Sequence, residues 1–119
     1  MPDSTFANKI PVQMVDKDAI SKAVKEQLQL LYGDRLAKVI LYGSYARGDF
    51  HEESDIDFLV VLKDKEINKG KEILQLSQAL SLLNLTYGII ISKHPTTVEE
   101  YQNSPFMYYQ NVRREGVEI

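Results

Sequence analysis

Hydrophobic residues in the first third of the chain change from helical spacing to strand spacing. From Asp16 onward apolar residues recur every three or four positions, which predicts an amphipathic helix. Asp16 is a suitable residue to cap this helix, and Gly33 is a suitable residue to end it. A run rich in β-branched residues over 38–42 then predicts a short buried strand. The helical positions are Ile20, Ala23, Val24, Leu28 and Leu31.

A second strand is predicted over 54–62, where side chains alternate between two faces. Beyond its first residues both faces are apolar, as expected of a strand that is covered on both sides. One face carries Asp55, Asp57, Leu59 and Val61, and the other carries Ile56, Phe58, Val60 and Leu62. Two carboxylates therefore lie on the same face at the start of an otherwise apolar strand.

The second half of the chain repeats the alternation of helix and strand. Helical spacing resumes over 73–84, and the segment 86–92, which contains three consecutive isoleucines, predicts a third strand. Pro95 is expected to break the chain. Two short helices are expected after it, one capped by Thr96 or Thr97 and one running from Ser104-Pro105 to Arg114.

The order of elements predicts a mixed α/β domain of the α+β class, with a small sheet covered by helices. We expect residues 1–15 to form an irregular N-terminal arm, because they mix prolines and polar residues with scattered apolar ones. Residues 16–119 are expected to form a single domain, since the chain of 119 residues is long enough for one modest core.

Composition excludes several classes of function. The chain contains no cysteine, which rules out disulfides and zinc–thiolate sites and is compatible with a cytoplasmic location. It has no apolar run near the roughly 18 residues that span a bilayer, so membrane insertion is not expected. The net charge of −3 gives no broad basic field, which makes nucleic acid an unfavoured partner.

The glycine turn after the first strand and the aspartates of the second are the candidate chemistry. At a separation of roughly 4 Å and an effective dielectric near 20, two carboxylates repel by about 4 kcal/mol, so an unscreened pair needs a cation or a shared proton. Mg²⁺, which binds one or two carboxylates together with substrate phosphates, suits Asp55 and Asp57. Gly43 allows close approach of a phosphate, Ser44 can cap the following short helix, and Arg47 can reach phosphates or carboxylates.

Each of these features also has a structural interpretation. Gly43-Ser44 can be an ordinary turn with a helix cap, and Asp55 can cap the strand or pair with Arg47. Taken alone, each residue favours that interpretation. Their combination favours a functional site for phosphate and metal, because a turn able to bind phosphate lies about ten residues before a pair of carboxylates on one strand face.

The segment Gly43-Ser44-Tyr45-Ala46-Arg47-Gly48, followed by Ser54-Asp55-Ile56-Asp57, resembles the signature of the minimal nucleotidyltransferases (MNT) of the DNA polymerase β-like superfamily. The resemblance implies a Mg²⁺-dependent transfer of AMP from ATP. Carried over residue by residue, it makes Gly43, Ser44 and Arg47 nucleotide-binding, and makes Asp55 and Asp57 catalytic ligands of one or two Mg²⁺ ions.

The chain departs from the family pattern at one position. Active members commonly supply a third carboxylate from a neighbouring strand, and the predicted strand 86–92 contains neither Asp nor Glu. Glu99 and Glu100 lie beyond Pro95 in a helical context and are not assigned the role. Two functions therefore remain open, a nucleotidyltransferase and a nucleotide-binding regulatory module that acts by binding a partner.

The resemblance also implies a partner protein. Members of the family commonly act as antitoxins for a helical toxin of the higher-eukaryote-and-prokaryote nucleotide-binding (HEPN) class, either by transferring AMP to it or by forming a complex. An aromatic C-terminal segment, Tyr101 to Tyr109, is available for an interface, although a helix packed back on the sheet is the preferred explanation. The acceptor itself cannot be deduced from the residues.

Overall fold

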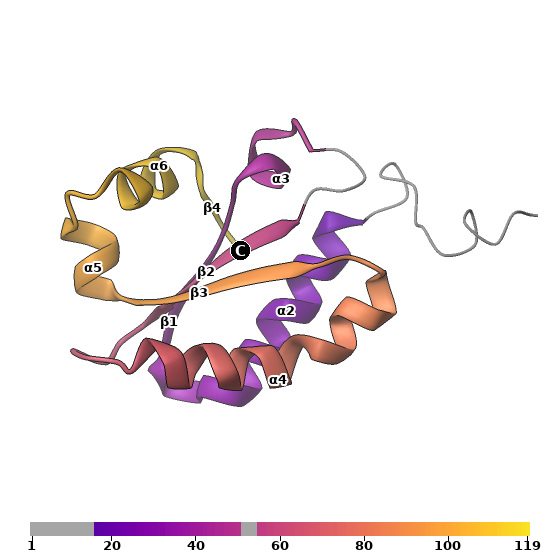
Figure 1. The fold of residues 1–119 in the computed structure, drawn as a ribbon, viewed down its shortest axis with the longest axis horizontal. Coiled ribbons are helices and arrows are strands. Elements are labelled where there is room, and N and C mark those ends of the chain that lie inside the picture. The colour runs from indigo at the N-terminus through magenta and orange to yellow at the C-terminus, as the bar shows by residue number, and fades with distance from the viewer. Residues whose placement is uncertain (1–15, 51–54) are drawn as a thin grey trace, which may run out of the picture.

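A four-stranded mixed sheet forms the centre of the fold (Figure 1). The computed structural model describes residues 16–50 and 55–119, so the predicted arm over 1–15 lies outside the described residues. The strand order is β3-β2-β1-β4; β1 is antiparallel to both of its neighbours, and β2 and β3 are parallel. The strands are β1 (Leu36–Tyr42), β2 (Ile56–Leu62), β3 (Ile91–Thr97) and β4 (Val117–Glu118).

Helices cover both faces of this sheet, which confirms the predicted α+β class. The two long helices, α2 (Lys17–Tyr32) and α4 (Lys69–Tyr87), pack on one face. The short helices α5 (Val98–Asn103) and α6 (Met107–Glu115) lie on the other face (Figure 1). Helix α3 (Ser44–Arg47) is a single turn at the end of β1.

The predicted limits of α2 are confirmed. The Asp16 carboxylate accepts a hydrogen bond from the backbone N–H of Ala19 at 3.0 Å and so caps the first turn. Gly33 ends the helix with a φ of 55°, a conformation that residues with a β-carbon rarely adopt. A single 3-10 turn then leads directly into β1.

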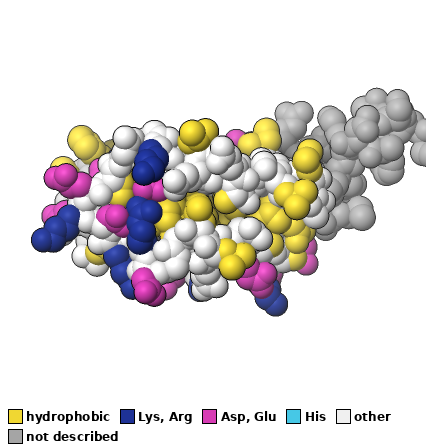
Figure 2. Space-filling model, turned by 90° about the horizontal axis from the view of Figure 1, so that it is seen from below, with side chains coloured by type: hydrophobic (Ala, Val, Ile, Leu, Met, Phe, Trp, Pro, Cys, Tyr) yellow, Lys and Arg dark blue, Asp and Glu magenta, His cyan; other side chains and the backbone are white. Residues whose placement is uncertain are grey.

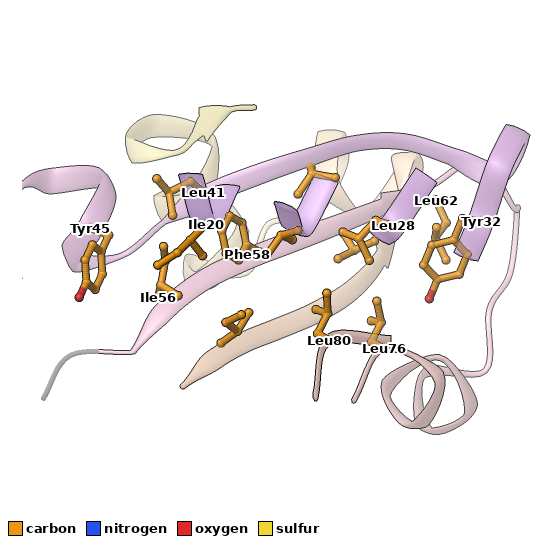
Figure 3. Packing of buried hydrophobic residues seen from close by; sticks show 14 residues of the cluster. Ile20, Leu28, Tyr32, Leu41, Tyr45, Ile56, Phe58, Leu62, Leu76 and Leu80 are labelled. Atoms are coloured by element: carbon orange, nitrogen blue, oxygen red, sulfur yellow. The ribbon is translucent and has the colours of Figure 1, made fainter. Parts of the chain in front are cut away.

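The predicted alternation of β2 divides the core into two parts. Ile56, Phe58 and Leu62 point toward α2 and α4, where they pack with buried residues such as Leu28 and Leu80 (Figure 3). Leu59 and Val61 point the other way and pack with Ile40, Tyr109 and Val112. Because every residue from Phe58 to Leu62 is fully buried, β2 fixes the position of the acidic residues at its start.

The third strand differs from its predicted position. The segment 86–92 was expected to be extended, but α4 continues to Tyr87 and β3 begins only at Ile91. Gly88, with a φ of 62°, ends the helix, and the side-chain oxygen of Asn84 accepts the N–H of Ile91 at 3.1 Å. The local strand preference of the isoleucines is therefore partly overridden by the longer helix.

Pro95 does not break the chain, contrary to expectation. It lies within β3, where it is paired in register with Val60 of β2. The strand tolerates proline because β3 is an edge of the sheet, so one side of its backbone needs no hydrogen-bond donor. After β3, the Thr97 hydroxyl accepts the N–H of Glu100 and begins α5, which confirms the predicted threonine cap.

A buried carboxylate joins α2 to α4 at one end of the core. Glu72 is only 4 % exposed and accepts hydrogen bonds from the Tyr32 hydroxyl at 3.2 Å and from Nη2 of Arg35 at 2.8 Å. Arg35 also binds the carboxylate of Asp64 at 3.0 Å. Burial and the neighbouring Glu72 raise the pKa of Tyr32, so its hydroxyl stays protonated and continues to donate.

Arg35→Ala is expected to lower the free energy of unfolding by about 2–3 kcal/mol, because it leaves the buried Glu72 carboxylate without its cationic partner. The partial exposure of Arg35 keeps this below the cost of breaking a fully buried pair. Lys38→Ala is the matched control, since it removes an exposed pair with Glu118 and should change stability by less than about 1 kcal/mol. Urea denaturation measures both variants, and equal effects would contradict the structural role of Glu72.

No helix among residues 16–50 and 55–119 has the length and apolar character needed to cross a membrane.

Candidate nucleotide and metal site

The glycine turn lies between the end of β1 and the start of α3. Gly43 has a φ of 75° and a ψ of −154°, a region of backbone conformation that is essentially restricted to glycine. Its carbonyl accepts the N–H groups of Ala46 and Arg47, both at 3.1 Å. The prediction that Ser44 caps the helix is wrong, because Gly43 is the cap residue and Ser44 is the first helical residue, with no side-chain capping bond.

Asp57 lies directly against this turn. In the sheet register it is opposite Tyr42 on one side and Ser92 on the other, so β1 and β3 hold it from both flanks. A β-carbon built on Gly43 would lie 2.5 Å from Oδ2 of Asp57 and 3.3 Å from its Cγ. The absence of a side chain at Gly43 therefore lets the turn backbone and the Asp57 carboxylate meet.

The environment of Asp57 disfavours its charged form. Burial raises the pKa of its carboxyl group, and the negative charge of Asp55 raises it further. A hydrogen-bond contribution from Ser92 and the positive charge of Arg47 act in the opposite direction but do not reverse the shift. Asp55 itself is exposed and precedes the first residue of β2. The two aspartates therefore interact electrostatically, although β2 begins after Asp55, which the predicted strand had included. Their role as metal ligands stays a prediction.

Arg47 acts electrostatically on Asp57, but its guanidinium is paired with two other carboxylates. Its Nε is 3.2 Å from the Asp49 carboxylate, and its Nη1 is 3.3 Å from the carboxylate of Glu115 on α6. Its charge still acts on Asp57 by lowering the pKa of that group. A role for Arg47 in binding phosphate stays a prediction.

A pocket of about 200 Å³ opens beside the glycine turn. One wall is the end of β1 and the other is α6, where the Tyr108 hydroxyl donates to the Tyr42 hydroxyl at 2.8 Å. Burial raises the pKa of both phenols, so both remain protonated at neutral pH. The residues that line it are Tyr42, Gly43, Arg47, Tyr108, Asn111, Val112 and Glu115.

Sequence reasoning missed the contribution of α6 to this pocket. Asn111 and Glu115 lie more than sixty residues from Gly43, and nothing in their local sequence marks them. The preferred interpretation of the aromatic segment is confirmed for its tyrosines, since Tyr109 is buried against the sheet. Phe106 and Met107, in contrast, are 71 % and 69 % exposed.

The donors present suit a hard cation held by few protein ligands. Asp55 and Asp57 offer carboxylate oxygens of the kind that Mg²⁺ binds, and the Asp57 carboxylate adjoins the position that a side chain at Gly43 would fill. Among the described residues no group of three or more acidic or histidine side chains gathers as a metal site, and β3 offers Ser92 rather than a carboxylate. Glu100 binds Lys69 and Thr96 instead. The arrangement thus fits an ion whose remaining ligands are phosphate and water.

Comparison with known proteins defines the class. Residues 18–107 match the model of the nucleotidyltransferase domain family. The chain is 36 % identical over 100 residues, 84 % of its length, to a Methanocaldococcus jannaschii protein named "Putative protein adenylyltransferase MJ0141", of which the match spans 95 %. The chain therefore belongs to the nucleotidyltransferase domain family. Within it, the predicted resemblance to the minimal nucleotidyltransferases is confirmed.

Solved structures share the fold. A chain in a crystal structure of a toxin-antitoxin with AMP-PNP superposes with a TM-score of 0.57 at 21 % identity, covering 87 % of this chain and 71 % of that one. A structure of a tri-AMPylated Shewanella oneidensis HEPN toxin in complex with MNT antitoxin gives a TM-score of 0.55 at 19 % identity, with the same coverage of each chain. At these identities the likeness concerns the fold.

Proposed function

We propose that this protein is a Mg²⁺-dependent nucleotidyltransferase that transfers AMP from ATP to a protein acceptor. The observation that carries the proposal is the close approach of the Asp57 carboxylate to the Gly43 turn, beside which a pocket of about 200 Å³ opens. Residues 16–119 act in it as one domain. The relatives from M. jannaschii, which are named as protein adenylyltransferases, support the choice of a protein as acceptor.

In the proposed reaction, an acceptor hydroxyl oxygen attacks the α-phosphorus of ATP. A new P–O bond forms, the bond from the α-phosphorus to the bridging oxygen breaks, and pyrophosphate leaves; the hydroxyl proton passes to solvent. Mg²⁺ would be held by Asp55 and Asp57, at one or two positions, and would neutralise charge on the phosphates. The backbone at Gly43 and Ser44 would position the triphosphate, and no protein nucleophile is required.

The proposed acceptor is a HEPN-type toxin, for which this protein would act as antitoxin. The shared fold with chains from toxin-antitoxin complexes supports this choice. The exposed Phe106 and Met107 at the start of α6 lie on the same side of the sheet as the candidate site and are available to a protein partner.

Incubation with ATP labelled at the α-phosphate, Mg²⁺ and the protein encoded by the adjacent reading frame tests the proposal. We expect label on the partner, and expect none when EDTA is present. Absence of transfer in every combination would contradict the enzymatic function.

A second candidate function is a nucleotide-binding module that neutralises its partner by complex formation. The observation that favours it is the absence of a carboxylate in β3 beside Asp57, within the part of the chain that the structure describes. Calorimetry distinguishes the two candidates, because Mg²⁺-dependent ATP binding without label transfer supports the module. Equal ATP affinity in the wild type and in Asp55→Asn plus Asp57→Asn would argue against the site in both functions.

A further inference from the structure

Helix α4 carries an apolar outer face that the described residues leave uncovered. Its inner side is fully buried through Leu76 and Leu80, whereas Leu74 and Leu85 on the outer side are 61 % and 81 % exposed. Figure 2, which views the molecule from the side of α4, shows hydrophobic side chains gathered on this surface. Large exposed apolar residues on one helix side are typical of a contact with another protein surface.

The same part of α4 contains no charged residue. From Ile73 to Tyr87 the sequence consists only of apolar residues and of Gln, Ser, Asn and Thr. A solvent-facing helix side is normally rich in charges, whereas the centre of a protein interface is depleted in them. The composition therefore indicates a surface that another molecule covers.

The pattern of residues on this side suits a second copy of the chain as the partner. Leu74, Gln78, Ser81 and Leu85 are all exposed and follow one another at intervals of four, three and four residues, which places them in one row along the helix. We call this row the α4 seam. Its spacing is the same when read in either direction, and so is its order of leucine, polar, polar, leucine.

We propose that the α4 seam is a homodimer interface, in which α4 of a second copy packs antiparallel across a two-fold axis. This arrangement places Leu74 of each copy against Leu85 of the other, and Gln78 against Ser81. A two-fold interface must be self-complementary, and a row with this symmetry meets that requirement. The polar pair at the centre can form hydrogen bonds across the axis and so fix the register.

Charge at the helix ends supports the antiparallel direction. Lys71, in the first turn of α4, is exposed and lies beside the positive end of its own helix dipole. In the antiparallel pair it faces the C-terminal, negative end of the other α4. A parallel pair would instead bring the two lysines together.

The proposed dimer leaves the candidate site open. α4 packs on the sheet face that carries Phe58, whereas Asp57 points to the opposite face, which α6 covers. The proposed dimer and the nucleotide site are consequently independent, so an experiment can contradict one proposal without contradicting the other.

Light scattering coupled to size-exclusion chromatography tests the proposal on the full chain. The molar mass measured for the wild type is expected to be twice the chain mass of 13.6 kDa. The double variant Leu74→Glu plus Leu85→Glu places like charges at both contacts of the seam and should be a monomer. The double variant Leu74→Lys plus Leu85→Glu places opposite charges at those contacts and should remain a dimer, which only the antiparallel register explains.

Met107→Glu is the matched control, because Met107 is exposed to a similar extent as Leu74 but lies on α6. It should leave the dimer intact. Circular dichroism on each variant confirms that α4 still folds, so that loss of the dimer is not loss of the fold. A monomeric wild type overturns the proposal, and so does a monomeric Leu74→Lys plus Leu85→Glu variant that is folded.

Discussion

Asp57→Asn is expected to raise the melting temperature of the metal-free protein at neutral pH while removing its response to Mg²⁺. Burial and the charge of Asp55 hold the pKa of the Asp57 carboxyl above its ordinary value, so its ionisation costs folding free energy. The substitution removes this charge and keeps the shape and the polar contact with Ser92. Activity and unbound stability therefore change in opposite directions.

The sign of this effect depends on pH. Below the unfolded pKa of the carboxyl, near 3.9, both states are protonated and the wild type has no penalty. As pH rises toward the raised folded pKa, the unfolded chain loses its proton first, and the wild type loses stability relative to the variant. The difference in melting temperature should accordingly vanish in acid and reach its full value above the folded pKa.

In the presence of Mg²⁺ and ATP, the wild type is expected to have a higher melting temperature than Asp57→Asn. A ligand present at one hundred times its dissociation constant stabilises by about 2.7 kcal/mol, which corresponds to a shift on the order of 10 °C for a chain of this size. The wild type should show this shift and Asp57→Asn should not, and AMP transfer should fall by about 100-fold or more, since loss of even an outer-shell partner of a metal costs 10–100-fold. Differential scanning fluorimetry measures both parts; an equal Mg²⁺ shift in the two proteins would remove Asp57 from the site.

Gly43→Ala is expected to reduce AMP transfer by about 100-fold. Its methyl group would occupy the position 2.5 Å from Oδ2 of Asp57, so either the turn or the carboxylate must move. A displacement near 1 Å at a reacting centre can cost this much in rate. The positive φ of Gly43 adds a backbone cost of about 1–3 kcal/mol to stability.

Gly48→Ala separates the effect of backbone strain from the effect of the close approach to Asp57. Gly48 also has a positive φ, 82°, but a β-carbon there would meet no atom within 4 Å. The variant should lose about 1 kcal/mol of stability and keep nearly all of its activity and nucleotide affinity. If both alanine variants reduced transfer equally, the effect would come from backbone strain in α3 and not from the approach of Gly43 to Asp57.

The sequence predicts best what neighbouring residues determine. The alternation of β2 and the caps at Asp16 and Thr97 depend on local spacing. The approach of Asp57 to the Gly43 turn follows once β1 and β2 pair. The position of β3 was mispredicted because three isoleucines favour an extended chain locally, whereas α4 gains by packing further residues before Gly88 ends it. Local sequence preference alone does not show whether the strand preference of the isoleucines or the packing of α4 is the larger effect.

Contacts between distant segments account for what the sequence could not predict in the site. Arg47 was expected to reach phosphates or the aspartates, and its pairing with Glu115 of α6 was not foreseen, because the packing of α6 on the sheet decides that pairing. The Tyr42–Tyr108 hydrogen bond has the same origin. Both contacts depend on the position of α6 on the sheet, which no local pattern encodes.

Pro95 has a consequence for how the molecule can associate. An open edge strand exposes unpaired backbone N–H groups and can be extended by a strand from another molecule. Here one edge of the sheet contains a proline, which lacks that donor, and the other edge is β4, only two residues long. The proline weakens β3 as a template for strand addition and β4 offers only two residues of backbone, so strand addition is disfavoured at these two strands and contacts between molecules fall mainly to the helices and their side chains.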